Sequence, residues 1–105
     1  MISLLPQCTK EIAEFPEEVR EDLIDALARL EKGHILSMPL SRPMPSIGKG
    51  VHELRLRDRS GIYRVIYVLV GAGAIYLIHA FVKKDKKTPM PNIDLAKKRL
   101  KDLKR

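Results

Sequence analysis

Residues 51–82, VHELRLRDRSGIYRVIYVLVGAGAIYLIHAFV, decide the fold. The stretch begins with apolar and charged side chains in alternation over residues 51–57, the period-two pattern of a strand with one buried face. Residues 62–70 and 74–82 are almost continuous in aliphatic, β-branched and aromatic residues, which is typical of strands inside a sheet. Short turns separate the three segments. The stretch therefore predicts a three-stranded antiparallel meander.

Helical patterns lie on both sides of this stretch. Residues 9–15 predict a short helix capped by Thr9, and residues 16–32 predict a second helix with apolar side chains at helical spacing. Residues 34–50 contain three prolines and two glycines, which predicts a long irregular connection. A last helix is expected to begin at Asn92.

The length and composition indicate one soluble globular domain over residues 1–105. Hydrophobic residues make up 45% of the chain and charged residues 31%, which is too apolar for disorder. The order of elements predicts an α+β domain with its helices on one side of the sheet. The single cysteine, Cys8, cannot form an internal disulfide and is expected to be buried. Without a signal peptide or an apolar run long enough to span a membrane, the chain is expected to be cytoplasmic.

Charge is distributed unevenly along the chain, whose net charge is +7. Residues 1–40 carry four basic and eight acidic side chains, whereas residues 41–105 carry sixteen basic and five acidic ones. This polarity suits a protein that presents a basic face to a polyanion. A basic surface that is merely solvated is the alternative interpretation.

Five cations of the predicted meander are expected to converge on one face and one end of the sheet. Arg55 and Arg57 alternate to the same face, Arg64 lies on the next strand, and Lys83 and Lys84 close the third. Guanidinium groups bind phosphate through paired N–H donors, and such cations stabilise the charge that develops at phosphorus when a 2′-hydroxyl attacks it. Each cation taken alone is as easily a solvent-facing strand residue.

Other chemistries have little support in the sequence. His34, His52 and His79 do not have the spacing of metal ligands, and His79 is expected to be a core or cross-strand residue. No catalytic motif surrounds Cys8, and no glycine-rich phosphate loop precedes a helix. We therefore expect neither a metal nor a cofactor.

Four sequence elements follow one another from residue 52 to residue 99. They are HELRLR at 52–57, IYRVIY at 62–67, IYLIHAFVKK at 75–84, and KTP at 87–89 followed by a helix with Ala96 and Arg99. In their order and approximate spacing they resemble the phage-derived HigB-like toxins of the RelE/ParE superfamily. The resemblance implies an α+β, RelE/ParE-like fold, with N-terminal helices packed on an antiparallel β-meander and a C-terminal helix.

The same resemblance implies a function and partners. It implies the toxin of a type II toxin–antitoxin system, a ribosome-dependent mRNA endoribonuclease that inhibits translation by cleaving RNA without a metal. The implied partners are the 70S ribosome with its mRNA and a helix-turn-helix, HigA-like antitoxin, through which alone the protein would reach operator DNA. No membrane partner is implied.

Site residues follow from the same motifs. The resemblance implies catalytic roles for Arg57, Arg64, Lys83 and Lys84, with Arg64 at the scissile phosphate, so that Arg64→Ala is expected to abolish toxicity and leave the fold intact. RNA or ribosome contacts are expected from Arg55, Lys86, Lys87, Lys97, Lys98 and Lys101. Glu53 stands where RelE enzymes carry a lysine that takes part in proton transfer. The general acid and base are therefore left unassigned.

Two alternatives remain open at this point. A ParE-like toxin would share the fold and inhibit DNA gyrase without any nuclease activity, although the basic cluster favours RNA. A non-enzymatic module would use the lysine-rich last helix to follow nucleic-acid phosphates. Cleavage of mRNA during translation separates the first interpretation from both.

Overall fold

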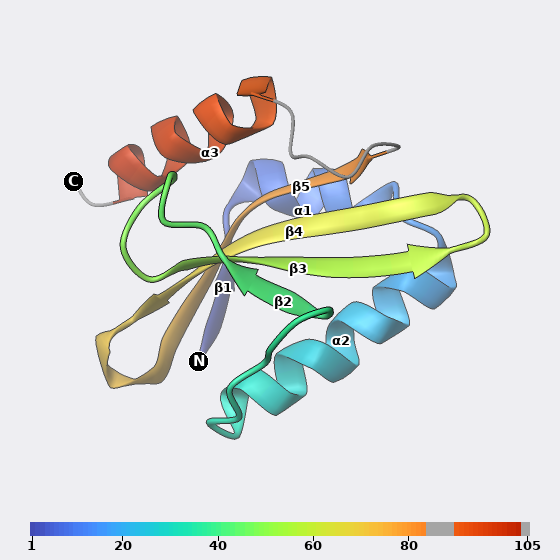
Figure 1. Cartoon of the computed structure of the whole chain (residues 1–105), viewed down its shortest axis with the longest axis horizontal. Coiled ribbons are helices and arrows are strands. Elements are labelled where there is room, and N and C mark those ends of the chain that lie inside the picture. The colour runs from blue at the N-terminus through green and yellow to red at the C-terminus, as the bar shows by residue number, and fades with distance from the viewer. Residues whose placement is uncertain (84–89, 104–105) are drawn as a thin grey trace.

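A five-stranded sheet forms the centre of the protein (Figure 1). The structure is a computed structural model that describes residues 1–83 and 90–103. The strands are β1 (Ile2–Leu4), β2 (Ser41–Pro43), β3 (Val51–Asp58), β4 (Gly61–Val70) and β5 (Ala74–Lys83). In space their order is β1-β5-β4-β3-β2. The predicted antiparallel meander is confirmed as β3, β4 and β5, while β1 adds in parallel to β5 and β2 adds antiparallel to β3.

Three helices accompany the sheet, and two of them begin earlier than predicted. They are α1 (Pro6–Ala13), α2 (Glu17–Glu31) and α3 (Met90–Leu103). Thr9 does not cap α1, because its hydroxyl donates to the carbonyl oxygen of Leu5 at 3.4 Å, as threonines do inside helices. The helix α2 has the predicted bounds. Pro16 precedes this helix, and Glu17 and Glu18 lie in its first turn, at the positive end of the helix dipole. Gly33 follows the helix at φ 86°. None of the described helices is long and apolar enough to cross a membrane.

The helices cover both faces of the sheet, and the expectation of helices on one side is wrong. Alternate residues of a strand point to opposite faces, and the central strand β4 is buried continuously from Tyr63 to Val68. Each face of β4 therefore needs an apolar cover. The helices α1 and α2 pack with Leu54, Val65 and Leu77 on the first face. The helix α3 packs through Ala96 and Leu100 on the second face, against Val51, Ile66, Val68 and Ile78.

The connection over residues 34–50 contains an ordered strand that the sequence did not predict. Within it, β2 pairs with β3 so that Ser41 lies opposite Leu54, and the Ser41 and Tyr67 hydroxyls are 2.6 Å apart in the core. The proline at position 43 is tolerated because β2 is an edge strand. Gly50 directly precedes β3 and has φ 77°, and a Cβ atom there would lie 2.9 Å from the carbonyl oxygen of Leu69.

Candidate functional site

The second face of the sheet is divided into an apolar half and an arginine-rich half. On β3, Val51 packs under α3, and the residues that follow on the same face are Glu53, Arg55 and Arg57. Cross-strand partners share a face, and Arg64 of β4 lies opposite Arg55. On the other side of β3, position 42 of β2 lies opposite position 53. The register thus gathers four arginines and one glutamate toward the β3–β4 turn.

A buried carboxylate lies at the centre of these arginines. The Oε1 atom of Glu53 is 2.8 Å from Nη1 of Arg64, 3.5 Å from Nε of Arg42 and 3.6 Å from Nε of Arg55. Glu53 and Arg64 have no exposed surface, whereas the side chains of Arg42 and Arg55 are 31% and 20% exposed. The guanidinium groups of Arg42 and Arg55 are therefore the part of this cluster that solvent reaches.

The Arg64 side chain lies in the interior of the protein. Its side chain is fully buried on the central strand and donates to Glu53. Burial lowers the pKa of Arg64 from its ordinary value, and the charge of Glu53 opposes that shift. Arg64 has no exposed surface in this structure, and its short contact with Glu53 joins two buried charges on neighbouring strands. Its role at the scissile phosphate stays a prediction.

Arg55 and Arg57 line an open hollow on the surface. This hollow has a volume of about 400 Å³, and Pro39 and Leu40, which precede β2, complete its described lining. Arg57 is exposed, and the backbone N–H of Arg55 donates to the carbonyl oxygen of Leu40 at 2.8 Å. The hollow therefore offers guanidinium groups on a rigid strand to a ligand from solvent.

The predicted lysines divide into three groups. The backbone of Lys83 lies opposite Ile62, which itself lies opposite Arg57, so positions 57, 62 and 83 form one row across three strands. On α3 the lysines at positions 97, 98 and 101 are exposed, on the side away from the buried Ala96. The remaining predicted residues, Lys84, Lys86 and Lys87, lie outside the described residues.

A second polar cluster, which the sequence analysis missed, joins α1, β5 and α3. Arg99 donates through Nη1 and Nη2 to the two carboxylate oxygens of Glu11, at 2.8 and 3.1 Å. His79 is almost fully buried, with Nδ1 3.1 Å from both oxygens of Glu11 and Nε2 2.7 Å from Oδ1 of Asn92. Asn92 therefore lies within the first turn of α3, where its side chain forms a hydrogen bond with His79. It is not the first residue of the helix, as the sequence predicted. No local motif reveals this cluster, because its members come from three separate elements.

This second cluster replaces a missing strand at the edge of the sheet. β1 pairs with β5 only as far as Leu77, which leaves the backbone groups beyond it without a neighbouring strand on that side. The carboxylate of Glu11 accepts the N–H of Ala80 at 3.1 Å, and Arg99 donates to the carbonyl oxygen of Ile78 at 3.0 Å. The cluster accordingly protects a free sheet edge, and His79 is a structural residue within it.

The pKa of Glu11 reflects these contacts. Burial alone would raise the pKa, since it favours the neutral carboxyl group. Hydrogen bonds from Arg99, from the N–H of Ala80 and from His79 outweigh that effect, and they hold the pKa of Glu11 below its ordinary value of 4.5. The ionised carboxylate is thus the form that stabilises the fold.

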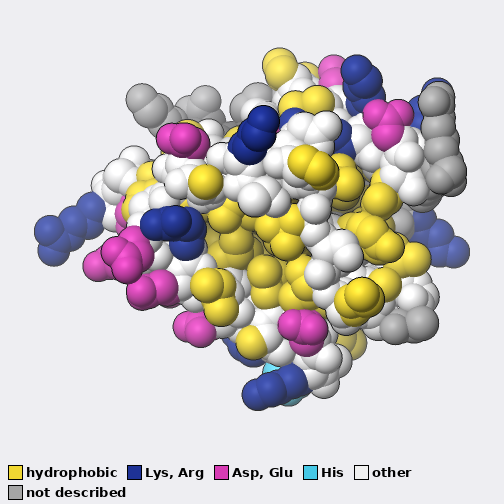
Figure 2. All heavy atoms as spheres, turned by 180° about the vertical axis from the view of Figure 1, so that it is seen from behind, with side chains coloured by type: hydrophobic (Ala, Val, Ile, Leu, Met, Phe, Trp, Pro, Cys, Tyr) yellow, Lys and Arg dark blue, Asp and Glu magenta, His cyan; other side chains and the backbone are white. Residues whose placement is uncertain are grey.

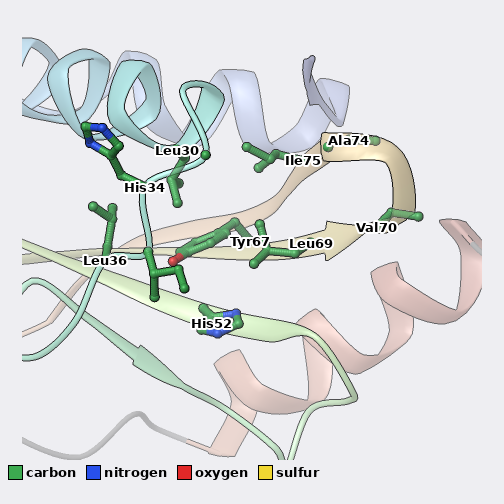
Figure 3. A pocket seen from close by; sticks show the side chains of 12 residues that line it. Leu30, His34, Leu36, His52, Tyr67, Leu69, Val70, Ala74 and Ile75 are labelled. Carbon is green, nitrogen blue, oxygen red and sulfur yellow. The ribbon is translucent and has the colours of Figure 1, made fainter.

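An apolar hollow of about 220 Å³ lies between the end of α2 and the β4–β5 turn (Figure 3). Leu30, Leu36 and Tyr67 are part of its lining, with His34 and His52 beside them. On the side of the molecule opposite to that seen in Figure 1, apolar side chains gather over the middle of the surface and charged side chains lie around them (Figure 2). Because the lining of this hollow contains no arginine or lysine, it does not suit a phosphate.

His52 does not belong to the arginine-rich half of the sheet. His52 lies on the opposite face of the sheet, where its ring stacks on Tyr67 with centroids 5.3 Å apart. Within residues 1–83 and 90–103, no three His, Cys, Asp or Glu side chains are grouped so that they could hold a metal ion.

Cys8 is buried, as predicted, and we expect it to be unreactive in the folded protein. Burial, with a smaller contribution from the charge of Glu11, raises the pKa of the thiol to about 12, and the nucleophile is the thiolate. Iodoacetamide is expected to leave the native protein unmodified and to alkylate it fully in denaturant, as measured by intact mass. Rapid alkylation of the native protein would contradict this prediction.

Comparisons with known proteins agree with this architecture. No curated protein sequence matches the chain significantly. Among solved structures, the chain is similar to one from the RelB–RelE antitoxin–toxin complex of Methanococcus jannaschii, at 12% sequence identity and a TM-score of 0.56. That similarity covers 76% of this chain and 88% of the other, and it confirms the predicted RelE-like fold. Residues 10–101 match the family described as phage-derived protein Gp49-like (DUF891), and the chain therefore belongs to that family.

Proposed function

We propose that this protein is the toxin of a type II toxin–antitoxin system and cleaves mRNA on the translating ribosome. The observation that carries the proposal is the arginine cluster around Glu53, with Arg55 and Arg57 lining an open hollow beside it. Guanidinium groups on a rigid strand fit a phosphodiester backbone, because their paired N–H donors match the phosphate oxygens. The family match and the RelE-like fold support the toxin assignment.

The proposed chemistry needs no metal. The 2′-hydroxyl oxygen of the substrate attacks the adjacent phosphorus, the bond to the 5′-oxygen breaks, and a 2′,3′-cyclic phosphate and a 5′-hydroxyl end result. Arg57 stabilises the charge that develops on the phosphate oxygens, and Lys83 and Lys84 are proposed to contribute to the same step. Arg55, Lys86 and Lys87 bind neighbouring phosphates, and the α3 lysines at 97, 98 and 101 bind ribosomal RNA.

The proposal includes partners and a location. A RelE chain is solved in complex with its antitoxin RelB, and we infer that this chain also pairs with an antitoxin, of the helix-turn-helix, HigA-like class. Its other partners are the 70S ribosome and mRNA, and its compartment is the cytoplasm. Contact with operator DNA would then occur only through the antitoxin.

Cleavage of a reporter mRNA in a cell-free translation system tests the proposal. Primer extension is expected to reveal new 5′ ends that form only while ribosomes translate. Arg57→Ala is expected to reduce their formation about 10–100-fold, because it removes a charged hydrogen bond worth about 1.5–3 kcal/mol. Arg29→Ala, a change of an exposed arginine on α2, is the matched control and should cleave like the wild type.

Other outcomes separate the alternatives. Full-length mRNA with undisturbed translation would contradict the proposal, and inhibition of gyrase supercoiling by the same preparation would then favour the ParE-like function. New ends that also form without ribosomes would keep the nuclease but contradict its dependence on translation.

A further inference from the structure

A second apolar hollow, of about 210 Å³, opens between the end of α3 and the β4–β5 turn. The residues that line it are Val68, Val70, Tyr76, Leu100 and Leu103. All five are aliphatic or aromatic. Sites for small molecules usually have volumes of about 300–1,000 Å³, so this hollow suits the apolar side chains of a partner protein better than a whole small ligand.

The surface beside this hollow is also apolar. Leu69 and Val70 are 44% and 47% exposed, and residues 65–78 contain no charged side chain. The β4–β5 turn lies at the lower left of Figure 1 and therefore at the lower right of Figure 2, where hydrophobic side chains reach the surface. Neighbouring apolar side chains that remain exposed around a hollow mark a site of protein interaction.

The backbone under the hollow has no room for an added strand. β4 lies between β3 and β5, and Val68 is the cross-strand partner of both Val51 and Tyr76. The N–H of Leu69 donates to the carbonyl oxygen of Gly50 at 2.9 Å. An occupant must therefore bind through its side chains, as an amphipathic helix does when its apolar face enters a groove.

Basic residues lie on two sides of the hollow. Gly48 packs so closely against α3 that a Cβ atom on it would lie 2.6 Å from the side chain of Leu100. Gly50 is hydrogen-bonded to β4. These neighbours hold the backbone of Lys49, whose side chain is exposed, at the edge of the hollow. On α3, residues 97–103 contain four basic residues and one acidic residue. An apolar helix face flanked by acidic side chains complements this surface.

Two other occupants fit the surface less well. A second copy of this chain carries the same net charge of +7, and a symmetric dimer through the hollow would bring the same basic residues together. An anionic membrane would match the charge, but lipid headgroups offer no apolar side chain to fill a hollow.

We propose that the hollow between α3 and the β4–β5 turn binds an amphipathic helix of a partner protein, with acidic side chains beside its apolar face. Val68 at the hollow and Ile62, the cross-strand partner of Arg57, are six residues apart on β4, which corresponds to roughly 20 Å. The inference goes beyond the proposed RNA cleavage, because it requires neither RNA nor the arginine-rich half of the sheet.

Fluorescence anisotropy with a labelled synthetic peptide tests the inference. The peptide has leucines at positions i, i+3, i+4 and i+7 of a helix, with glutamate and alanine elsewhere. A control peptide of the same composition has its leucines spread around the helix. The wild type is expected to bind the first peptide about tenfold more tightly than the second, because only the first presents one apolar face. Equal binding of the two peptides, or no binding, would overturn the proposal.

Two pairs of variants locate the peptide. Val70→Asp puts a negative charge in the hollow and is expected to weaken binding about tenfold. Val82→Asp is its matched control, at a valine that is 55% exposed near the other end of the sheet. Lys49→Glu, in an exposed position that tolerates the change, is expected to weaken binding about threefold. Lys10→Glu, at an exposed position on α1, is the control for it. Controls that weaken binding as much as their partners would show attraction by net charge alone and contradict the proposal.

Further outcomes separate this inference from the proposed function and from the other occupants. Arg57→Ala should bind the peptide like the wild type, and a loss of binding in it would place the peptide at the arginine-rich half instead. Peptide binding by a protein that cleaves no mRNA would support this inference and contradict only the proposed function. Binding to vesicles of phosphatidylserine and phosphatidylcholine, or a dimer in sedimentation, that Val70→Asp abolishes would assign the hollow to a membrane or to a second copy and overturn the proposal.

Discussion

Replacing Arg64 with alanine is expected to destabilise the folded protein by about 3–5 kcal/mol. The reason is that the change removes the guanidinium that donates to the buried Glu53 carboxylate at 2.8 Å, and leaves that carboxylate charge in the interior. For a domain of this size, 3 kcal/mol corresponds to a fall in melting temperature of roughly 12–24 °C. Thermal unfolding followed by circular dichroism measures it.

Two further variants make the test of Arg64 specific. Arg57→Ala, at an exposed position on the same face, is expected to change stability by less than about 0.5 kcal/mol. The double variant Glu53→Leu with Arg64→Met removes both charges together, and it should recover most of the stability lost in Arg64→Ala. Equal melting temperatures for Arg64→Ala and Arg57→Ala would contradict the structural role of Arg64.

This result would change how a loss of toxicity in Arg64→Ala is interpreted. The sequence-based expectation was loss of activity with an intact fold. The structure instead predicts a loss of stability, so reduced activity of this variant does not identify a catalytic residue. Arg57, whose side chain is exposed at the hollow, is the better residue for testing the chemistry.

Replacing Glu11 with alanine is expected to cost about 2–4 kcal/mol. The carboxylate accepts hydrogen bonds from Arg99 and from the backbone N–H of Ala80, and it contacts His79. Its removal leaves several partly buried polar groups unsatisfied, each at a cost of about 1–3 kcal/mol before relaxation and entry of water. Thermal unfolding at neutral pH measures the loss, and Glu14→Ala, at an exposed position just beyond α1, is the control.

Acid should reproduce part of this effect in the wild type. Because the pKa of Glu11 is lowered in the folded protein, the ionised carboxylate contributes its full stabilisation above the unfolded-state value near 4.5. That contribution is lost as the pH falls below 4.5 and through the folded-state pKa. Glu11→Gln is therefore expected to lose less stability than the wild type between pH 5 and about pH 3. Parallel curves for the two proteins over this range would contradict the assignment.

Local sequence signals predicted the meander and α2 well, for identifiable reasons. The alternation at residues 51–57 and the apolar runs after it specify strands independently of their surroundings. The helix α2 has its own start and end signals in Glu17, Glu18 and Gly33. The strand β2 was missed because its three residues are too few to carry a periodic pattern and end on a proline. It forms by pairing with the edge of β3.

The alternation in β3, by itself, determined that Arg55 and Arg57 would share one face, because side-chain direction in a strand follows from backbone geometry alone. The register between β3 and β4 brought Arg64 to the same face. Only the tertiary structure decided which of them are buried and which are exposed. Arg64 lies on β4, between two long strands, and is buried with Glu53. Arg55 and Arg57 lie on β3, which only the short β2 borders on its other side, and they retain exposed surface. Burial depends on what packs against a residue, which no pattern within its own strand specifies.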